Sequence, residues 1–411
     1  MQQPLATFND DATDRHCCVC GSQDRTLVLD QAVVDVVGIG ASGYRDLINV
    51  CNKCGFFYTA PLLPESVILH YYEAMSNYEH AETNGVRAIE DVRQIKRQVE
   101  LIEKQFPQSF KGNALDIGCS IAYGLSLLKK KGWNVLGLDP SDKCIEISKQ
   151  DLGVEVIKGF FSPKVQFKNS PFDLIILSHV VEHLIYPEEV LRGIRNVLSD
   201  EGLVYIEVPN TLKPNGTKSY FGFEHINYFT PTSLTNLLQQ NGFEVASIHT
   251  FDNGRHIHPF YPVIALLMKK SDKNFKIVND KDELLEVVKS YRIESNKIVE
   301  SFNSKIQSIL LNLTTKGRLA LWGAGLHTSQ LLADTILKPS DIHCIYDNNP
   351  KKSGSTLMGV PVKSFPESIE EAKSSIDAIL ISSEASENAI YSQLSYLQAV
   401  DIQIYKLYDS D

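Results

Sequence analysis

The sequence of 411 residues lacks an apolar run that could cross a membrane, because a spanning helix needs ~20 such residues. The apolar stretch from Pro259 to Met268 is too short. The first residues, Met1 to His16, are polar and lack the basic start and apolar region of a signal peptide. We therefore expect a cytoplasmic protein without a membrane partner.

The chain also has fewer basic than acidic residues. The chain has 40 Lys and Arg against 50 Asp and Glu, a formal net charge of −10. This balance disfavours nucleic acid as the main partner, because nucleic acid binding rewards a basic surface. Tandem repeats and low-complexity segments are absent as well. Because a single core rarely grows beyond ~250–300 residues, the length predicts two or three globular domains.

Four of the eight cysteines form two C-x-x-C turns, each followed by glycine. In a reducing compartment, paired cysteines are more often metal ligands than disulfides. Zinc takes four thiolates in a tetrahedron, so we predict a structural zinc ion, with a redox dithiol as the alternative. The predicted ligands are Cys17, Cys20, Cys51 and Cys54. His16 and Cys18 are neighbours that could replace one of them, and the long spacing between the turns predicts a small β-sheet.

Short apolar strands alternate with helices from Gly112 onward. The predicted strands are 114–117, 134–138, 154–157, 172–177 and 203–208. This alternation predicts a doubly wound, Rossmann-like α/β domain that binds its ligand at the carboxyl ends of the strands. A long helix over 281–313 and a second such pattern over 318–405 predict a C-terminal Rossmann-like α/β domain. The expected parts are a zinc-binding module (1–65), the central domain (66–268) and the C-terminal helix plus α/β domain (269–411).

The first two central strands end in residues suited to an adenosine ligand. The first ends in Asp116-Ile-Gly118-Cys-Ser120-Ile-Ala122, and the second ends in Asp139. A glycine turn lets the backbone approach a ligand closely, and a carboxylate on the next strand can accept both ribose hydroxyls. Ser120 and Ala122 stand where such loops usually have glycine.

Together with segments 172–184 and 198–210, this loop and acid resemble class I S-adenosylmethionine (SAM)-dependent methyltransferases. The resemblance covers about residues 112–245 and implies SAM as the cofactor. It implies that Asp116, Gly118 and Ser120 line the methionine end. It further implies that Asp139 holds the ribose, that Phe160 lies near the adenine, and that Ser178 edges the pocket.

His179, Glu182 and His183 also match the H-x-x-E-H pattern of some zinc proteases. That pattern requires a long helix and a third ligand, whereas here it follows a strand and Pro187 soon interrupts it. We therefore expect these residues to edge the SAM pocket. His179 is a candidate active-site residue, and His183 is expected to orient the loop.

An aromatic-rich loop from Tyr220 to Thr230 contains the adjacent pair Glu224 and His225. Histidine titrates near neutrality and can act as a general base, although such a pair could equally hold the loop in place. A cysteine module, a SAM domain with a Glu-His pair and a rear α/β domain, in this order, resemble the zinc-containing C-methyltransferases of nucleotide-linked keto-deoxysugars. Segments 322–325 and 347–354 add to this resemblance.

The resemblance implies that His225 removes the proton beside a sugar ketone and that the enolate attacks the SAM methyl group. Glu224 would orient His225 or a sugar hydroxyl. The family has a tyrosine where this chain has Gly222, and Tyr220 or Tyr228 could replace it. The expected partner is thus a small molecule, a nucleotide-linked sugar.

Three alternatives stay open on the sequence alone. The enzyme could methylate an oxygen or nitrogen of a sugar or another small molecule, with His225 deprotonating a hydroxyl. The chain could instead be a non-catalytic partner in a biosynthetic complex. The rear loop Gly323-Ala-Gly325 could mark a second nucleotide site or only shape the substrate cleft, and we do not predict NAD there.

Overall fold

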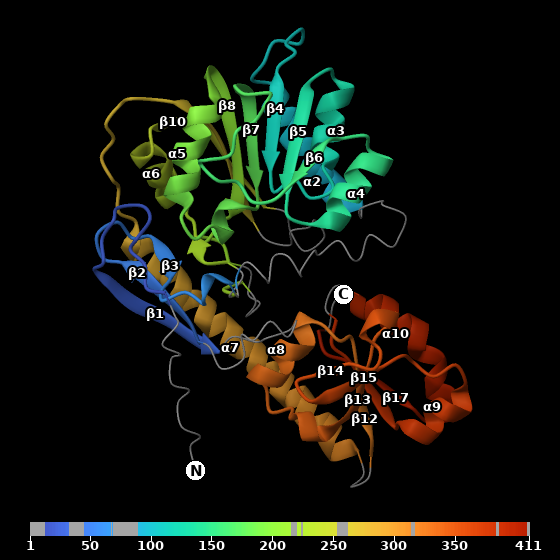
Figure 1. Cartoon of the computed structure of the whole chain (residues 1–411). Helices are drawn as coiled ribbons and strands as arrows, with labels where there is room; N and C mark the ends of the chain where they lie inside the picture. Colours follow the sequence, from blue (N-terminus) through green and yellow to red (C-terminus); the bar gives the residue numbers. More distant parts are fainter. Residues whose placement is uncertain are drawn as a thin grey trace. The chain divides into compact units, whose positions relative to one another are not determined.

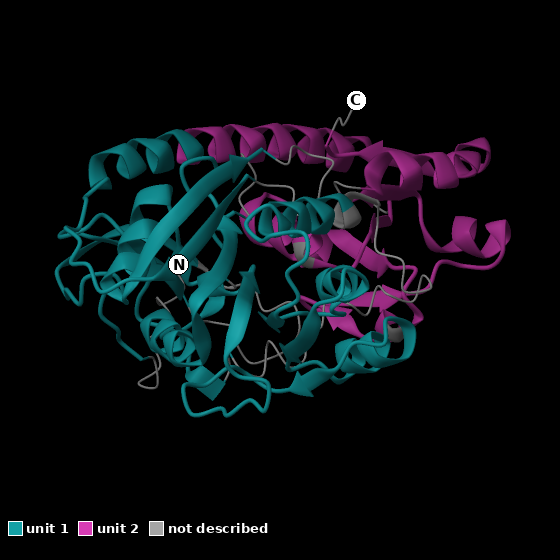
Figure 2. Ribbon diagram, turned by 90° about the horizontal axis from the view of Figure 1, so that it is seen from above, with its two compact units in different colours: residues 1–33, 39–215, 220–291 teal, residues 34–38, 216–219, 292–411 magenta. Residues whose placement is uncertain are grey.

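The structure of the chain is a computed structural model that describes residues 13–32, 45–66, 68, 89–214, 220–222, 225–252, 262–313, 317–383 and 386–408. The chain divides into two compact units (Figure 2). The first unit comprises residues 1–33, 39–215 and 220–291, and the second comprises residues 34–38, 216–219 and 292–411. The domain boundaries expected from the sequence stay predictions. Within the described ranges, no helix is long and apolar enough to cross a membrane.

A seven-stranded sheet with the order β10-β11-β8-β7-β4-β5-β6 forms the centre of the first unit. Its parallel strands are β4 (Asn113–Ile117), β5 (Asn134–Asp139), β6 (Val156–Lys158), β7 (Phe172–Ser178) and β8 (Leu198–Pro209). These strands confirm the predicted doubly wound α/β fold. The chain winds outward from β4 to β6 and then returns to β7 on the other side of β4, so the strand order reverses between β4 and β7.

Two antiparallel strands complete this sheet, β10 (Phe243–Phe251) and β11 (Val263–Lys270). The sequence analysis treated the second of these segments only as an apolar run. Residues 263–268 are all buried because β11 lies between β8 and β10. A strand buried on both faces gives an unbroken apolar run rather than an alternating one, so its periodicity does not reveal it.

Helices cover both faces of the central sheet (Figure 1). The helices α2 (Ile89–Glu103) and α3 (Tyr123–Lys130) pack on one face, and α5 (Pro187–Val197) and α6 (Pro231–Gln240) pack on the other. Successive strand residues alternate between the two cores. For example, Leu115 packs with α5 and α6, whereas Ala114 packs with α2 and α3. The helix α4 (Asp142–Asp151) connects β5 to β6.

A second, four-stranded antiparallel sheet of the first unit carries the cysteine turns. Its strands, in order, are β1 (Arg25–Ala32), β2 (Arg45–Cys51), β3 (Phe57–Thr59) and β9 (Asn227–Tyr228). The strands β1 and β2 lie between the two cysteine turns, as the spacing predicted. The strand β9 comes from the aromatic-rich loop, where Phe57 pairs with Tyr228 and Tyr58 pairs with Asn227.

The second unit has its own six-stranded sheet with the order β14-β15-β13-β12-β16-β17. The strands are β12 (Leu319–Trp322), β13 (Ile342–Tyr346), β14 (Thr356–Leu357), β15 (Val360–Lys363), β16 (Ala378–Ile381) and β17 (Gln403–Lys406). All but β14 run parallel. The helices are α8 (Leu326–Asp334), α9 (Ile369–Ser375) and α10 (Glu387–Leu394), after the long helix α7 (Lys281–Asn312). The predicted C-terminal α/β fold is confirmed.

Candidate active site

The loop after β4 is tied to β5 by its main chain, because the carbonyl of Leu138 accepts the N–H of Gly118 at 2.8 Å. Gly118 has a φ of 73°, a conformation that favours glycine. A Cβ atom at this position would lie 2.6 Å from Cγ2 of Val180. Ser120 and Ala122 have φ values of 53° and 55°. The loop thus keeps a glycine-type backbone although two of its residues carry side chains.

The carboxylate of Asp139, at the end of β5, organises this loop. Its Oδ2 accepts the N–H of Ser120 at 2.8 Å, and its Oδ1 accepts the N–H of Ser141 at 2.9 Å. Burial raises the pKa of Asp139, and these two N–H groups offset only part of that effect. Because a carboxylate oxygen has two acceptor positions, each oxygen keeps one for a ribose hydroxyl. The geometry therefore fits the ribose of SAM.

The other predicted cofactor residues belong to the same edge of the sheet. Asp116 is buried and precedes the last residue of β4, Ser178 is the last residue of β7, and Phe160 follows β6. The carboxyl ends of parallel strands meet at one edge, and β7, β4, β5 and β6 are consecutive in the sheet. The ring of Phe160 is 44% exposed, which leaves it available for contact with an adenine. The cofactor contacts of all these residues stay predictions.

A buried charge cluster surrounds Glu207 in β8, where the sequence analysis placed no functional residue. Glu207 is fully buried, and Nη2 of Arg97 lies 3.0 and 3.1 Å from its two carboxylate oxygens. The hydroxyl of Tyr205 and the amide of Gln94 each donate a hydrogen bond of 2.5 Å to this carboxylate. Burial by itself would raise the pKa of Glu207, but His179 and Arg97 outweigh it and lower the pKa to about 2.

His179 connects this cluster to a second buried carboxylate. Its Nε2 lies 3.7 Å from Oε1 of Glu207, and its Nδ1 lies 3.2 Å from Oε1 of Glu182. Burial alone would lower the pKa of His179, but the two carboxylates raise it to about 9. His179 is therefore protonated at neutral pH, where it donates hydrogen bonds and cannot accept a proton.

Glu182 lies in the short 3-10 helix η2 (Val181–His183) and faces three histidines. Besides its contact with His179, its Oε1 lies 3.8 Å from Nε2 of His183. The rings of His183 and His225 have centroids 5.0 Å apart. Glu182 is 1% exposed, and its Oε2 has no hydrogen-bond partner within the described part of the chain. One buried carboxylate, that of Glu182, thus lies next to three imidazole rings.

The main chain places His225 beside this carboxylate, because the N–H of Ile226 donates to the carbonyl of Glu182 at 3.0 Å. Burial lowers the pKa of His225 to about 3, with the charge of His183 adding to the effect and Glu182 opposing it. His225 is therefore a neutral imidazole, the form that accepts a proton. Its predicted partner Glu224 lies outside the described residues.

Tyr220, the remaining predicted catalytic residue, is buried among aromatic rings. Its ring centroid lies 5.1 Å from that of Phe221 and 6.4 Å from that of Tyr291. Burial raises the pKa of Tyr220, and the charge of Glu182 adds to this effect. The phenol therefore keeps its proton and lies within electrostatic reach of the histidine cluster.

The two C-x-x-C turns bring four thiols together. The sulfur atoms of Cys17 and Cys54 lie 3.5 Å apart, as do those of Cys20 and Cys51, and all four lie within 4.8 Å of one another. A tetrahedral zinc ion with Zn–S bonds of ~2.3 Å holds its sulfurs roughly 3.8 Å apart, so the donor set and spacing fit zinc. With sulfur at all four positions, such an ion would be structural.

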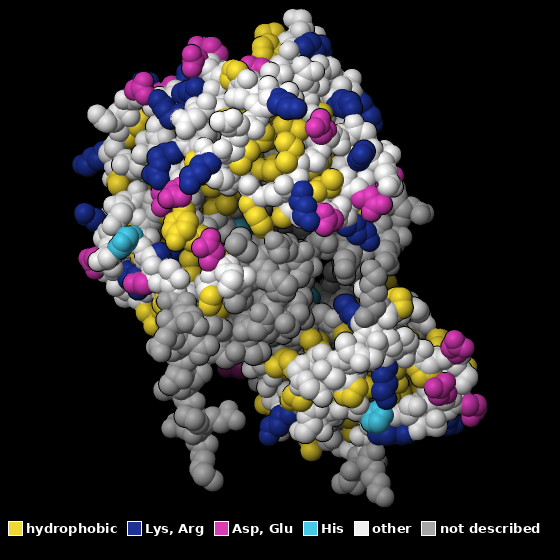
Figure 3. All heavy atoms as spheres, in the orientation of Figure 1, with side chains coloured by type: hydrophobic (Ala, Val, Ile, Leu, Met, Phe, Trp, Pro, Cys, Tyr) yellow, Lys and Arg dark blue, Asp and Glu magenta, His cyan; other side chains and the backbone are white. Residues whose placement is uncertain are grey.

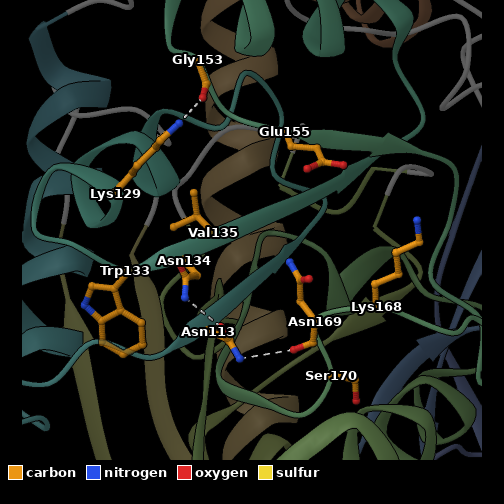
Figure 4. Close-up of a pocket in the computed structure, with 10 residues that line it drawn as sticks. All are labelled: Asn113, Lys129, Trp133, Asn134, Val135, Gly153, Glu155, Lys168, Asn169 and Ser170. Carbon is orange, nitrogen blue, oxygen red and sulfur yellow. Dashed lines mark hydrogen bonds between the residues drawn. The ribbon is translucent and has the colours of Figure 1, made fainter.

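An open hollow of about 700 Å³ lies at the opposite edge of the central sheet (Figure 4). It is lined by Asn113 and Asn134, the first residues of β4 and β5, and by Lys129 and Lys168 among others. None of the residues predicted to bind the cofactor lines this hollow, because they lie at or just beyond the carboxyl ends of the central strands. On the face of the first unit shown in Figure 3, basic and acidic side chains are interspersed.

The chain is similar to known methyltransferases. A sequence family described as "Methyltransferase domain" matches residues 89–248. The C-methyltransferase NovU of Streptomyces niveus is 23% identical over 372 residues, which cover 84% of this chain and 83% of NovU. The ubiquinone biosynthesis O-methyltransferase of Roseobacter denitrificans is 28% identical over 159 residues, 34% of this chain and 62% of that protein. A solved N1-methyltransferase of Burkholderia thailandensis has a TM-score of 0.39 at 14% identity and covers 54% of this chain and 98% of its own.

The doubly wound α/β fold and the family match at residues 89–248 together identify a class I SAM-dependent methyltransferase. The chain is a SAM-dependent methyltransferase whose similarity to a C-methyltransferase extends well beyond this domain.

Replacing Cys54 with serine is expected to lower the zinc content from about one ion per chain and to reduce the yield of folded protein, because a structural zinc site contributes to folding. Metal analysis of the purified protein measures this. Cys18→Ser is the matched control and should keep its zinc, since Cys18 does not belong to the four-sulfur group. A wild-type protein without zinc, or a Cys54→Ser variant with full zinc content, would refute the assignment.

His179 should make stability depend on pH in the alkaline range. Its pKa of about 9 in the folded chain lies above the value of ~6.5 expected on unfolding. Its protonation therefore stabilises the fold fully below about pH 6.5, and this contribution is lost as the pH rises through about 9. Urea unfolding midpoints between pH 7 and 10 should fall more steeply for the wild type than for His179→Gln. His249→Gln is the control, and parallel curves for the wild type and His179→Gln would contradict the assignment.

Proposed function

We propose that this methyltransferase transfers the methyl group of SAM to a carbon of a nucleoside-diphosphate-linked keto-deoxysugar, with His225 as the general base. NovU is named as a C-methyltransferase, and its similarity covers 84% of this chain. The observation that carries the proposal is geometric: one side-chain nitrogen or oxygen of each of His225, Glu182 and His183 lies within 4.8 Å of the other two, and the N–H of Ile226 donates to the carbonyl of Glu182 at 3.0 Å. His225 belongs to the loops beyond the carboxyl ends of the central strands, where α/β sheets of this type bind ligands.

In the proposed reaction, a ring nitrogen of His225 takes the proton from the carbon beside the sugar ketone. The electron pair of the broken C–H bond passes into an enolate. When bound, SAM supplies an electrophilic methyl group on a positively charged sulfur. The enolate carbon would take up this methyl group, with S-adenosylhomocysteine as the leaving group, and His225 would then release its proton to solvent.

Glu182 supports this step electrostatically. A buried imidazole becomes a costly cation when it accepts a proton, and a nearby carboxylate lowers that cost. Glu182 is buried and raises the pKa of His225 against the effect of burial. Of the histidines around Glu182, His179 is already protonated, which favours His225 as the base.

Methyl transfer to an oxygen or nitrogen of a sugar or another small molecule is the second candidate. Two observations favour it: this chain has Gly222 where the resembling C-methyltransferases have tyrosine, and the central domain is similar to an O-methyltransferase. His225 would then deprotonate a hydroxyl instead of a carbon.

Replacing His225 with asparagine should lower kcat by about 10²–10⁴, the usual contribution of a general base. SAM binding, measured by calorimetry, should be unchanged, because none of the residues predicted to hold the cofactor is replaced. The assay uses a panel of nucleoside-diphosphate-linked keto-deoxysugars, and His249→Asn is the matched control. A loss of kcat below about tenfold would remove His225 from this role.

Solvent deuterium distinguishes carbon from oxygen or nitrogen methylation within the same assay. With S-adenosylhomocysteine in place of SAM, the wild type should exchange deuterium from D₂O into the carbon beside the ketone, and His225→Asn should not. An unexchanged substrate that is nevertheless methylated with SAM would favour the second candidate.

A further inference from the structure

The guanidinium of Arg15 is buried, at 7% exposed, and makes four hydrogen bonds within the first unit. Its Nε donates to the carbonyl of Thr59 at 2.9 Å, and its Nη1 donates to the carbonyl of Ile185 at 3.3 Å. Its Nη2 donates to the carbonyl of Ile226 at 2.5 Å and to Oδ1 of Asn227 at 3.0 Å. Four of the five guanidinium N–H groups are thus engaged, which fixes the orientation of the planar group.

These acceptors come from three separate segments that meet around the histidine cluster. Thr59 belongs to β3, Ile185 follows η2, and Ile226 directly follows His225. The carbonyl of Ile226 accepts a second bond, from the N–H of Thr59 at 3.0 Å. The N–H and the carbonyl of Ile226, the residue after His225, are therefore held by η2, by β3 and by Arg15.

Asn227 continues this arrangement. It is 2% exposed, and its Nδ2 donates to the carbonyls of Val181 at 3.1 Å and Leu184 at 2.7 Å. Its Oδ1 accepts from Arg15. The side-chain amide of Asn227 therefore bridges the helix that carries Glu182 and the guanidinium of Arg15. A buried amide oxygen that loses its donor carries an energetic penalty, so removing Arg15 would loosen this bridge.

Arg15 also belongs to the cysteine module, two residues before Cys17. That module continues into the same strands, because β9 pairs with β3 and the ring of Phe229 lies 5.2 Å from that of Phe56. Both phenylalanines pack in the core that contains Cys17 and Cys54. The cysteine turns and the segment that carries His225 thus share one sheet and one core.

We propose that Arg15 is a positioning residue for the methyl-transfer reaction, which fixes the segment carrying His225 against the helix carrying Glu182. The inference rests on the proposed role of His225 as the base. It assigns the cysteine module a second task besides folding, since this module supplies the side chain that sets the position of the base. A displacement of ~1 Å at a reacting group can cost roughly 10²-fold in rate. Loss of the guanidinium should therefore slow the removal of the proton by His225, whereas the binding of SAM should not change.

The test compares Arg15→Met and Arg15→Lys with the control Arg292→Met. Arg292 is exposed on α7 and belongs to the second unit. For Arg15→Met we expect kcat to fall by about 10–100-fold. The KM for the sugar and the Kd for SAM should stay close to those of the wild type, and the zinc content should stay at about one ion per chain, because Arg15 bonds to none of the predicted cofactor or zinc residues. Arg15→Lys should keep more kcat than Arg15→Met, because lysine retains a donor but lacks the planar fork.

Deuterium exchange with S-adenosylhomocysteine present separates the base from methyl transfer. Exchange should slow in Arg15→Met by the same factor as kcat. Equal kcat in the wild type and Arg15→Met would overturn the inference. So would a parallel loss of SAM binding and zinc, which would show a purely structural role. Should Arg15→Met fail to fold, Arg15→Lys decides by the same criteria.

A readout that does not require activity keeps this inference distinct from the proposed function. In protein labelled with ¹⁵N-histidine, the His225 ring signals, assigned with His225→Asn, should shift in Arg15→Met, and those of His249 should not. If these signals shift but the wild type exchanges no deuterium, the proposed chemistry fails while the positioning contact stands. If they do not shift, the positioning role is wrong.

Discussion

The parallel pairing of β4 with β5 on one side and β7 on the other is the constraint on which this site depends. Because these strands run parallel, the loops after them reach the same edge of the sheet, and the reversal of strand order opens a crevice there. Asp139 ties the loop after β4 to that after β5, and the N–H of His179 donates to the carbonyl of Glu207 at 2.8 Å, which ties the loop after β7 to β8. The cofactor loop and the histidine cluster therefore arise from one topology, and the positions of both depend on hydrogen bonds that cross between neighbouring strands.

The second unit has a similar loop and acid, but its acid lies beside a lysine of the same unit. Asp347 accepts the N–H groups of Ala324 and Asn349, each at 2.8 Å, much as Asp139 does in the first unit. Lys352, however, lies 3.2 Å from Oδ2 of Asp347 and donates at 2.8 Å to the carbonyl of Ala324. The ammonium group of Lys352 thus lies beside the carboxylate of Asp347, which is paired with groups of the protein itself. This geometry favours the interpretation of the rear loop as a structural element and gives no support to an NAD site.

The fold could be predicted from the sequence wherever local patterns determine it. The five parallel strands and the cysteine pairs follow from apolar periodicity and from residue spacing, and the structure confirms them. The buried cluster around Glu207 could not be predicted in full, because its partner Arg97 lies 110 residues away in sequence. Its only signal was a carboxylate inside the apolar segment 203–208. Arg15 carried no signal either, since its burial results from the pairing of β9 with β3 and from contacts that span up to 212 residues.

The central claim is that Asp139 and the loop after β4 hold SAM at this edge of the sheet. Calorimetry with SAM and with S-adenosylhomocysteine, on the wild type, Asp139→Asn and the exposed control Asp151→Asn, tests it most directly. The account predicts that the wild type and Asp151→Asn bind both ligands alike. It predicts that Asp139→Asn binds them about 10–100-fold more weakly, the usual cost of losing hydrogen bonds to a charged group. A wild type that binds neither ligand, or an Asp139→Asn variant that binds as the wild type does, would contradict it.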